Sequence, residues 1–191
     1  MVHNKINFQY YLKVQKVYYI CTMQLEEAKT KFINQWGSLG SKWGINRTMA
    51  QIHALFLTSN EPLSAEEVME TLQISRGNAN MNIRVLIDWG LVYKEHKLGE
   101  RKEFFTGEKD IWKVAQRVIK IRQRQELDPI IQVLTEIQNV ETTDSNTEEV
   151  VLFTQQIESI KSLAELADTS LTKISTSNQG WFLRTFMKLF K

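Results

Sequence analysis

The segment from Ser64 to Thr106 constrains the fold more than any other part of the chain. Glu67 follows Ser64 at the spacing of a capping box, so a helix should begin directly after Ser64. Apolar residues then recur at helical spacing up to residue 72, and Ser75 offers a second N-cap. These signals predict two short helices joined by a tight turn.

The second of these helices has two faces of different chemistry. Apolar residues from Ala79 to Ile87 form one face, which we expect to be buried, and Gly90 stands where a left-handed residue would end the helix. The opposite face is nearly free of acid and carries amide and guanidinium groups, which suit base edges in the major groove. For such a helix taken alone, a merely solvated face is the alternative. The candidate DNA-contacting residues are Ser75, Arg76, Gly77, Asn78, Asn80, Met81 and Arg84.

After this helix the sequence predicts a hairpin with a basic tip. Residues 91–93 and 102–106 are strand-like, and residues 98–100 can form the turn between them. Cations flank that turn, where a wing would need them to reach phosphates or a narrow minor groove. They are Lys97, Arg101 and Lys102. Two helices followed by a basic hairpin outline a winged helix-turn-helix, so we predict binding to double-stranded DNA.

Residues from Trp43 to Phe105 also resemble a known family. The stretches WGINRTMAQIHALF, LSAEEVMETLQISRGNANMNIRVLIDWGLVYK and GERKEFF are similar to regulators of the MarR superfamily, in particular the GbsR-type branch. The remainder of the chain resembles them only in its helical layout. The resemblance implies a dimeric transcription factor, usually a repressor, whose affinity for operator DNA responds to a small molecule. Choline is the effector associated with the namesake of that branch.

Sequence patterns divide the chain into four parts. Residues 1–22 hold four of the five tyrosines, three lysines and no acid, and we interpret them as an appendage. Residues 23–43 should form an N-terminal helix, residues 44–107 the DNA-binding domain, and residues 108–191 a helical dimerisation region. The fold class predicted is mainly α, with a winged helix-turn-helix DNA-binding domain and dimerisation helices from both ends of the chain.

The N-terminal helix carries an apolar stripe with two tryptophans. The stripe consists of Leu25, Ala28, Phe32, Trp36, Leu39 and Trp43. Core packing is the simpler interpretation, but indole faces also attract quaternary ammonium groups. Trp36, Trp43 and Trp112 flank the DNA-binding domain in the sequence, and we treat them as the candidate binding residues for a small-molecule effector.

The region after the hairpin is predicted to be helical. An amphipathic helix begins at Ile111, and Asp128-Pro129 should kink or restart it. After a polar segment over residues 141–147, apolar residues from Val150 to Ile174 follow a heptad pattern, which indicates lengthwise packing on another helix. That helix could belong to the same chain or to a second copy. We expect a homodimer, because a small winged domain usually reads DNA together with a partner copy.

The C-terminal segment GWFLRTFMKLFK combines aromatic and basic residues. We expect it to contribute to packing in the dimer, with contact to a membrane surface as the alternative. No stretch of the chain is apolar over the length that a membrane span needs. We therefore predict no membrane partner.

Motifs for catalysis or metal binding are missing from the sequence. The three histidines are scattered, and neither a phosphate loop nor a nucleophile motif occurs, so we expect no enzyme activity, no cofactor and no metal. The single cysteine, Cys21, excludes an internal disulfide and fits a reducing cytoplasm. The alternative to a regulator is a winged-helix protein-interaction module that does not bind nucleic acid.

Overall fold

The computed structural model describes residues 23–138 and 147–177. The expectations for residues 1–22, for most of the polar segment and for the C-terminal aromatic segment therefore lie outside the described residues. The elements are α2 (Leu25–Lys42), α3 (Arg47–Thr58), β1 (Leu63–Ser64), α4 (Ala65–Leu72), α5 (Arg76–Asp88), β2 (Val92–Glu95), β3 (Phe104–Gly107), α6 (Ile111–Arg122), a π-helical turn (Gln123–Leu127), α7 (Asp128–Glu136) and α8 (Thr147–Thr176).

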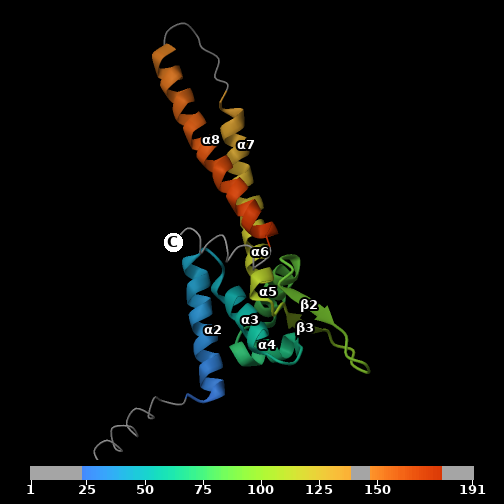
Figure 1. Ribbon diagram of the computed structural model, residues 1–191. Coiled ribbons are helices and arrows are strands. Elements are labelled where there is room, and N and C mark those ends of the chain that lie inside the picture. The colour runs from blue at the N-terminus through green and yellow to red at the C-terminus, as the bar shows by residue number, and fades with distance from the viewer. Residues whose placement is uncertain (1–22, 139–146, 178–191) are drawn as a thin grey trace, which may run out of the picture.

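The predicted winged helix-turn-helix lies beside α2, and the C-terminal helices extend away from it (Figure 1). Helices α3, α4 and α5 enclose a core that continues onto a small antiparallel sheet with the strand order β1-β3-β2. The largest fully buried apolar side chains of this core are Phe56, Ile52, Ile83, Leu86, Val68 and Val92. Strand β1 was not predicted, since it has only two residues and pairs with β3 through Leu63 and Phe105.

Local capping fixes the ends of the two short helices. The Ser64 N–H donates to Glu67 Oε2 at 2.6 Å and the Glu67 N–H donates to Ser64 Oγ at 3.3 Å, which is the predicted capping box. The Ser64 hydroxyl also donates to Glu67 Oε2 at 2.7 Å, and this bond together with the one from the Ser64 N–H lowers the pKa of the Glu67 carboxyl. Helix α4 ends at Gln73 in the left-handed region, with φ of 53°. Ser75 then caps α5, and Gly90 follows it with φ of 69°. The prediction of two capped helices around a tight turn is confirmed.

Helix α2 packs closely on α3 at its glycines, while part of its apolar stripe stays exposed. A Cβ on Gly37 would lie 2.6 Å from Gln51 Cγ, and a Cβ on Gly40 would lie 2.6 Å from Ala50 Cβ. Both glycines are buried, whereas Leu25 and Trp43 of the stripe are 67% and 60% exposed. The expectation that the stripe packs in the core was therefore wrong for these two residues. Close approach of the two backbones determines which face of α2 is covered.

We expect Gly40→Ala to destabilise the fold by about 1–3 kcal/mol, because the new methyl group meets Ala50 and forces α2 away from α3. Gly77→Ala is the matched control, since a Cβ at that helical position meets nothing within 4 Å. That control should gain up to about 1 kcal/mol from helix propensity. Urea denaturation measures both values. Equal stability of the Gly40→Ala variant and the wild type would contradict this packing.

The C-terminal half of the chain forms a long helical arm (Figure 1). Helix α6 continues through the π-helical turn into α7, which has Pro129 in its first turn, so the restart predicted at Asp128-Pro129 is confirmed. Helix α8 returns alongside α7 and α6. Gln123 is buried and donates through Nε2 to Asp168 Oδ1 at 2.8 Å and to Thr172 Oγ1 at 3.0 Å. These hydrogen bonds fix the register of α8 against the turn.

The heptad pattern of α8 is divided between two faces. Ile157 is buried, and Val150, Ala164 and Leu171 are half-buried in the arm. Three alternate heptad positions are left open, namely Phe153 and Ile160, each 42% exposed, and Ala167. An apolar face therefore remains uncovered along α8 within this chain. Its residues are Leu152, Phe153, Ile160, Leu163, Leu166 and Ala167, and we call it the α8 open face.

Candidate nucleic-acid interface

Helix α5 presents the predicted polar face to the outside. Arg76, Gly77 and Arg84 are exposed, and Met81 is 57% exposed. A Cβ on Gly77 would meet no atom within 4 Å, so the backbone there can approach a ligand closely. The arrangement places a guanidinium group at each end of an acid-free surface, with a bare backbone between them. Such a surface has the dimensions and the donors to enter a major groove.

Two candidate residues on α5 already have partners. Arg76 Nη2 lies 3.3 Å from Glu66 Oε1 of α4, in an exposed ion pair of little energetic weight. Asn82 Nδ2 donates to Asn78 Oδ1 at 2.7 Å and to the Asn78 carbonyl at 2.8 Å. The bond to Oδ1 engages the side-chain oxygen that Asn78 would need for a bidentate bond to adenine. Asn80 is therefore the better placed of the two predicted amides.

Asn82 is a structural residue that sequence reasoning missed. Its side chain is buried in α5, on the face that holds Ala79, Ile83 and Leu86. An amide at an apolar position of an amphipathic helix could have indicated this structural role from the sequence, because a buried polar group needs a partner within reach. Asn78 lies one helical turn earlier and supplies that partner.

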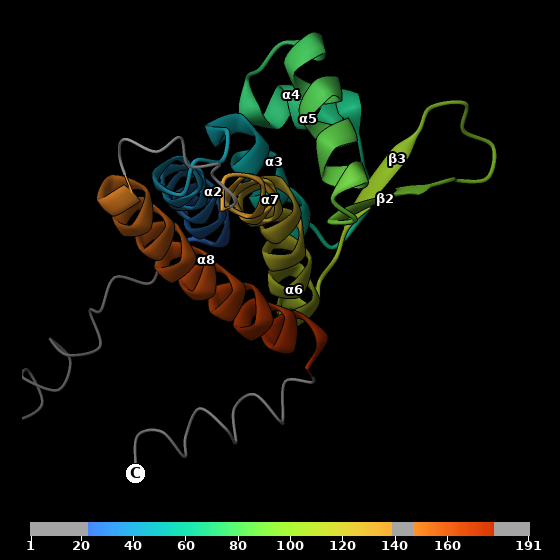
Figure 2. The same cartoon turned by 90° about the horizontal axis from the view of Figure 1, so that it is seen from above.

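The hairpin of β2 and β3 projects on the side of the domain away from α2 (Figure 2). Its turn contains Gly99 with φ of 84°, and the Glu100 N–H donates to the Lys97 carbonyl at 3.1 Å. Leu98 at the tip is fully exposed. We refer to residues 96–103 as the wing tip. The predicted hairpin and its turn are confirmed.

The three predicted wing cations differ in the contacts that they make with the rest of the domain. Lys97 Nζ lies 4.2 Å from the centroid of the Phe104 ring and donates to the Pro62 carbonyl at 3.4 Å, so it folds back toward the domain. Lys102 Nζ lies 5.2 Å from the same ring. Arg101 is exposed next to the turn. Arg101 and Lys102 are therefore better placed than Lys97 to reach a phosphate.

The wing and helix α5 are close enough for a charge on one to affect a titratable group on the other. The pKa of the Glu103 carboxyl in the wing is lowered, mainly by the hydrogen bond from Lys94 and to a smaller extent by the charge of Arg84. The Lys94 Nζ lies 2.6 Å from Glu103 Oε1, across the hairpin. A negative DNA backbone that lies along α5 would therefore also come near the wing.

Arg117 of α6 joins the base of the wing to the end of α5. Its guanidinium donates to the Gly90 carbonyl, lies 3.3 Å from Glu108 Oε2 and stacks 5.5 Å from the Tyr93 ring centroid. Burial raises the pKa of the Glu108 carboxyl, but hydrogen bonds from the Asp110 N–H and the Tyr93 hydroxyl bring it below its usual value. This cluster therefore connects α6 to the residue that follows α5 and to strand β2.

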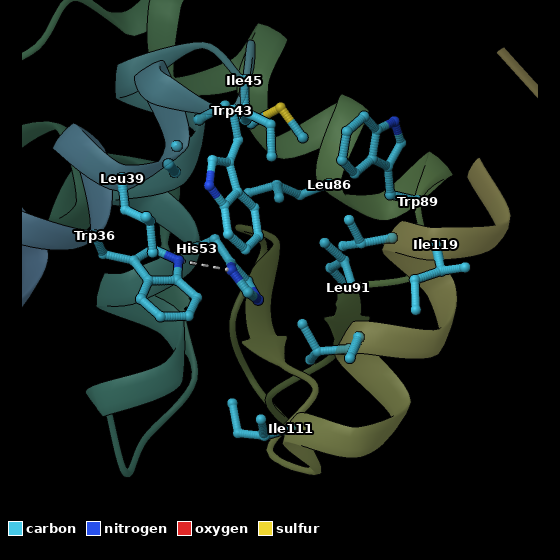
Figure 3. A pocket seen from close by; sticks show the side chains of 16 residues that line it. Trp36, Leu39, Trp43, Ile45, His53, Leu86, Trp89, Leu91, Ile111 and Ile119 are labelled. Carbon is cyan, nitrogen blue, oxygen red and sulfur yellow. Dashed lines mark hydrogen bonds between the residues drawn. The ribbon is translucent and has the colours of Figure 1, made fainter. Parts of the chain in front are cut away.

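A cavity of about 430 Å³ lies between α2, α3, the end of α5 and α6 (Figure 3). Trp36 and Trp43 line it, as does Trp89, which the sequence did not single out. Trp112 is not among the lining residues, and its indole N–H donates to the Ser177 carbonyl at 3.2 Å. The full lining is Trp36, Leu39, Gly40, Trp43, Ile45, Met49, Ala50, His53, Leu86, Trp89, Leu91, Ile111, Val114, Ala115, Val118 and Ile119.

His53 is the one titratable side chain among these lining residues. It is 5% exposed, and Trp36 Nε1 donates to its Nδ1 at 3.4 Å (Figure 3). Within the described part of the chain, no residue supplies a hydrogen-bond partner for its Nε2. Burial lowers the pKa of His53 from 6.5 to about 4, so the imidazole is neutral at physiological pH.

The fold and its exposed polar helix define a winged-helix protein of the helix-turn-helix type. Residues 43–102, which include the whole of α3, α4 and α5, match the model of the MarR family. A solved structure described as a transcriptional regulator has a TM-score of 0.60 and 16% sequence identity, covering 78% of this chain and 95% of its own. That likeness concerns the fold alone. No curated protein matches the sequence.

Residues 23–138 and 147–177 contain no group of three or more His, Cys, Asp or Glu side chains that could hold a metal ion. Over the same ranges, none of the helices combines the length and apolar character needed to cross a membrane.

Proposed function

We propose that this chain is a transcriptional regulator that binds double-stranded DNA sequence-specifically through α5 and the wing. The observation that carries the proposal is the exposed face of α5, which is free of acids from Arg76 to Arg84, beside the wing cations. Arg84 and Asn80 would contact base edges, while Arg101 and Lys102 would contact phosphates or a narrow minor groove. The match of residues 43–102 to the MarR family supports the same function.

We further propose that the regulator acts as a homodimer. The α8 open face is an apolar stripe on a helix about 45 Å long, and Leu163 and Leu166 within it are 68% and 64% exposed. Stripes of this length are normally covered by a partner. The exposed residues of α2, such as Leu25 and Phe32, add a second surface for the partner copy. Two recognition helices would then meet successive major grooves about 34 Å apart.

The cavity offers a way to control DNA binding by a small molecule. Leu86 and Trp89 at the end of α5 line it together with Val118 and Ile119 of α6, so a ligand there touches both the recognition helix and the arm. A ligand that binds better to one spacing of the two DNA-binding domains shifts the dimer toward that spacing. The resemblance to the GbsR-type branch favours a repressor.

A salt titration of DNA affinity tests the function. Replacing Arg101 and Lys102 by Ala should weaken binding to all sequences and reduce the slope of log affinity against log salt by about 0.9 per lost phosphate contact. The matched control removes two exposed cations of the arm, Arg124 and Lys173, and should leave the slope unchanged. No DNA binding by the wild type at low salt would leave the protein-interaction module as the better description.

A further inference from the structure

A basic run begins just before α6 and continues along it. Residues 109–124 contain six lysines or arginines but a single acid, Asp110. Such a run is usually a solvated face or a contact surface for a negative partner. Half of these six cations instead donate to backbone carbonyls of this chain. They are Lys109, Arg117 and Arg122.

Each of these three cations binds the C-terminal end of a different helix. Lys109 Nζ donates to three carbonyls at the end of α3, Arg117 to the carbonyl just past α5, and Arg122 to that of the C-cap residue of α2. Carbonyls at helix C-terminal ends lack intrahelical partners and lie at the negative end of the helix dipole, so a cation stabilises them. The accepting residues are Phe56, Leu57 and Ser59 of α3, Gly90 after α5 and Trp43 after α2.

Side-chain packing alone leaves the direction of α6 poorly constrained. Val114 and Val118 of α6 reach the core, but the cavity of about 430 Å³ lies on the same side, between α6 and the three helices that the cations bind (Figure 3). A helix that borders a cavity can tilt more easily, because it has fewer close-packed neighbours on that side. The hydrogen bonds from the three cations cross to the backbone of α2, α3 and the residue after α5, so they can supply the missing constraint.

A small tilt of α6 has a large effect at the far end of the arm. From Ile111 to Glu136 the chain is helical throughout, which makes a lever about 39 Å long at 1.5 Å per residue. A rotation of about 5° at its base moves the far end by about 3.4 Å, the rise of one base pair of DNA. The direction of α6 therefore determines where the arm lies relative to α5 (Figure 1).

We propose that Lys109, Arg117 and Arg122 are positioning residues that fix the angle between the arm and the DNA-binding domain, and so set the half-site spacing that the dimer prefers. The spacing rests on the proposed function, whereas the angle is a property of the chain itself. A purely stabilising role would lower the free energy of unfolding and leave angle and spacing unchanged. Angle and spacing therefore distinguish the two roles.

A distance between the domain and the arm tests the angle directly. Spin labels are attached at exposed positions of α4 and α7 through Glu70→Cys and Thr135→Cys, with Cys21→Ser removing the natural thiol. An excess of unlabelled full-length protein is added, so that each pair of labels reports one chain. Double electron–electron resonance should give one narrow distance distribution. Adding Lys109→Met and Arg122→Met should shift or broaden it by about 3 Å or more, as expected from the length of the lever.

Lys113→Met with Arg124→Met is the matched control, because it removes two exposed cations of the same run. Lys113 forms a loose ion pair with Asp110 at 4.0 Å. The control should keep the wild-type distribution. Lys109→Arg with Arg122→Lys keeps a cationic donor at both helix ends and should restore most of it. If the double methionine variant does not fold, each single variant is measured in the same way. A folded variant with the wild-type distribution would overturn the proposal.

The spacing of the operator provides the second test. One base pair is added to or removed from the spacer of an operator selected from random sequences. In the wild type this change should weaken binding by a factor on the order of 10², because the second domain no longer engages. The double methionine variant should lose less than about tenfold, since its domains can adjust to the new spacing. An equal loss in both proteins would overturn the link between the three cations and the spacing.

The positioning role and the proposed function can fail separately. A wild type that binds no DNA would lose the function, while the distances between spin labels would still decide the angle. A protein that binds its operator, but whose double methionine variant keeps the wild-type distances, would retain the function and lose the positioning role.

Discussion

Leu163→Glu should convert the protein from a dimer to a monomer and lower its affinity for a two-site operator by a factor on the order of 10² to 10⁴. Leu163 is 68% exposed on the α8 open face, where a carboxylate would be buried against the partner copy. Once the two DNA-binding domains are separate, the second binding event is no longer intramolecular and the gain from linking them is lost. Multi-angle light scattering and operator binding measure the two effects.

Ser162→Glu provides the matched control for this experiment. It introduces the same charge one residue earlier on α8, at an exposed polar position outside the open face. The control should remain dimeric and bind the operator as the wild type does. If the Leu163→Glu variant stays dimeric and its operator affinity is unchanged, the α8 open face does not form the dimer interface.

Local chemistry explains why the helix-turn-helix could be predicted from sequence. A capping box at Ser64 and a second cap at Ser75 act within three residues, so the sequence alone contains all the partners. Gly90 adopts the positive φ angle that its position after α5 suggested, and Gly99 adopts one within the predicted turn. The wing tip follows from the same turn chemistry, because no distant residue is needed to form it.

Features that depend on distant contacts could not be predicted in this way. The apolar stripe of α2 suggested one buried face, but the clash distances at Gly37 and Gly40 show that the glycines face α3 instead. The heptads of α8 were compatible with a partner in the same chain or in a second copy. Only the packing of α8 against α6 and α7 shows that Ile157 is covered while Leu163 is exposed.

The candidate site also has one part that local sequence predicts and another part that depends on distant contacts. The exposed face of α5 was predicted residue by residue, since helical spacing alone places Gly77 and Arg84 on it. The cavity draws on four elements that are far apart in sequence, so the contributions of Trp89 and His53 became visible only in the folded chain. Lys97 is a similar case, because its contact with the Pro62 carbonyl joins two segments 35 residues apart.

Hydrogen bonds from α6 connect the wall of the cavity to the ends of α5 and α2. Leu91 lines the cavity, and the Gly90 carbonyl beside it accepts a hydrogen bond from Arg117 of α6. Arg122, at the end of α6, donates to the Trp43 carbonyl on the opposite side of the cavity. A ligand that moves α6 would therefore pull on both the end of α5 and the end of α2.

Arg84→Ala tests most directly whether α5 reads DNA, with an operator first obtained by selection from random sequences. Removing its guanidinium should cost about 1–3 kcal/mol at that operator and much less on random DNA, so specificity falls before general affinity. Gly77→Val should also weaken operator binding, because a branched side chain there holds the backbone away from the groove. A Cβ at this position meets no atom within 4 Å, so the variant should still fold.

The decisive measurement is the ratio of operator affinity to random-DNA affinity for the wild type and these two variants, with circular dichroism confirming that each is folded. We predict that the ratio falls by about 5- to 150-fold in Arg84→Ala. The ratio should also fall in Gly77→Val. An unchanged ratio in both folded variants would contradict the assignment of α5 to the major groove.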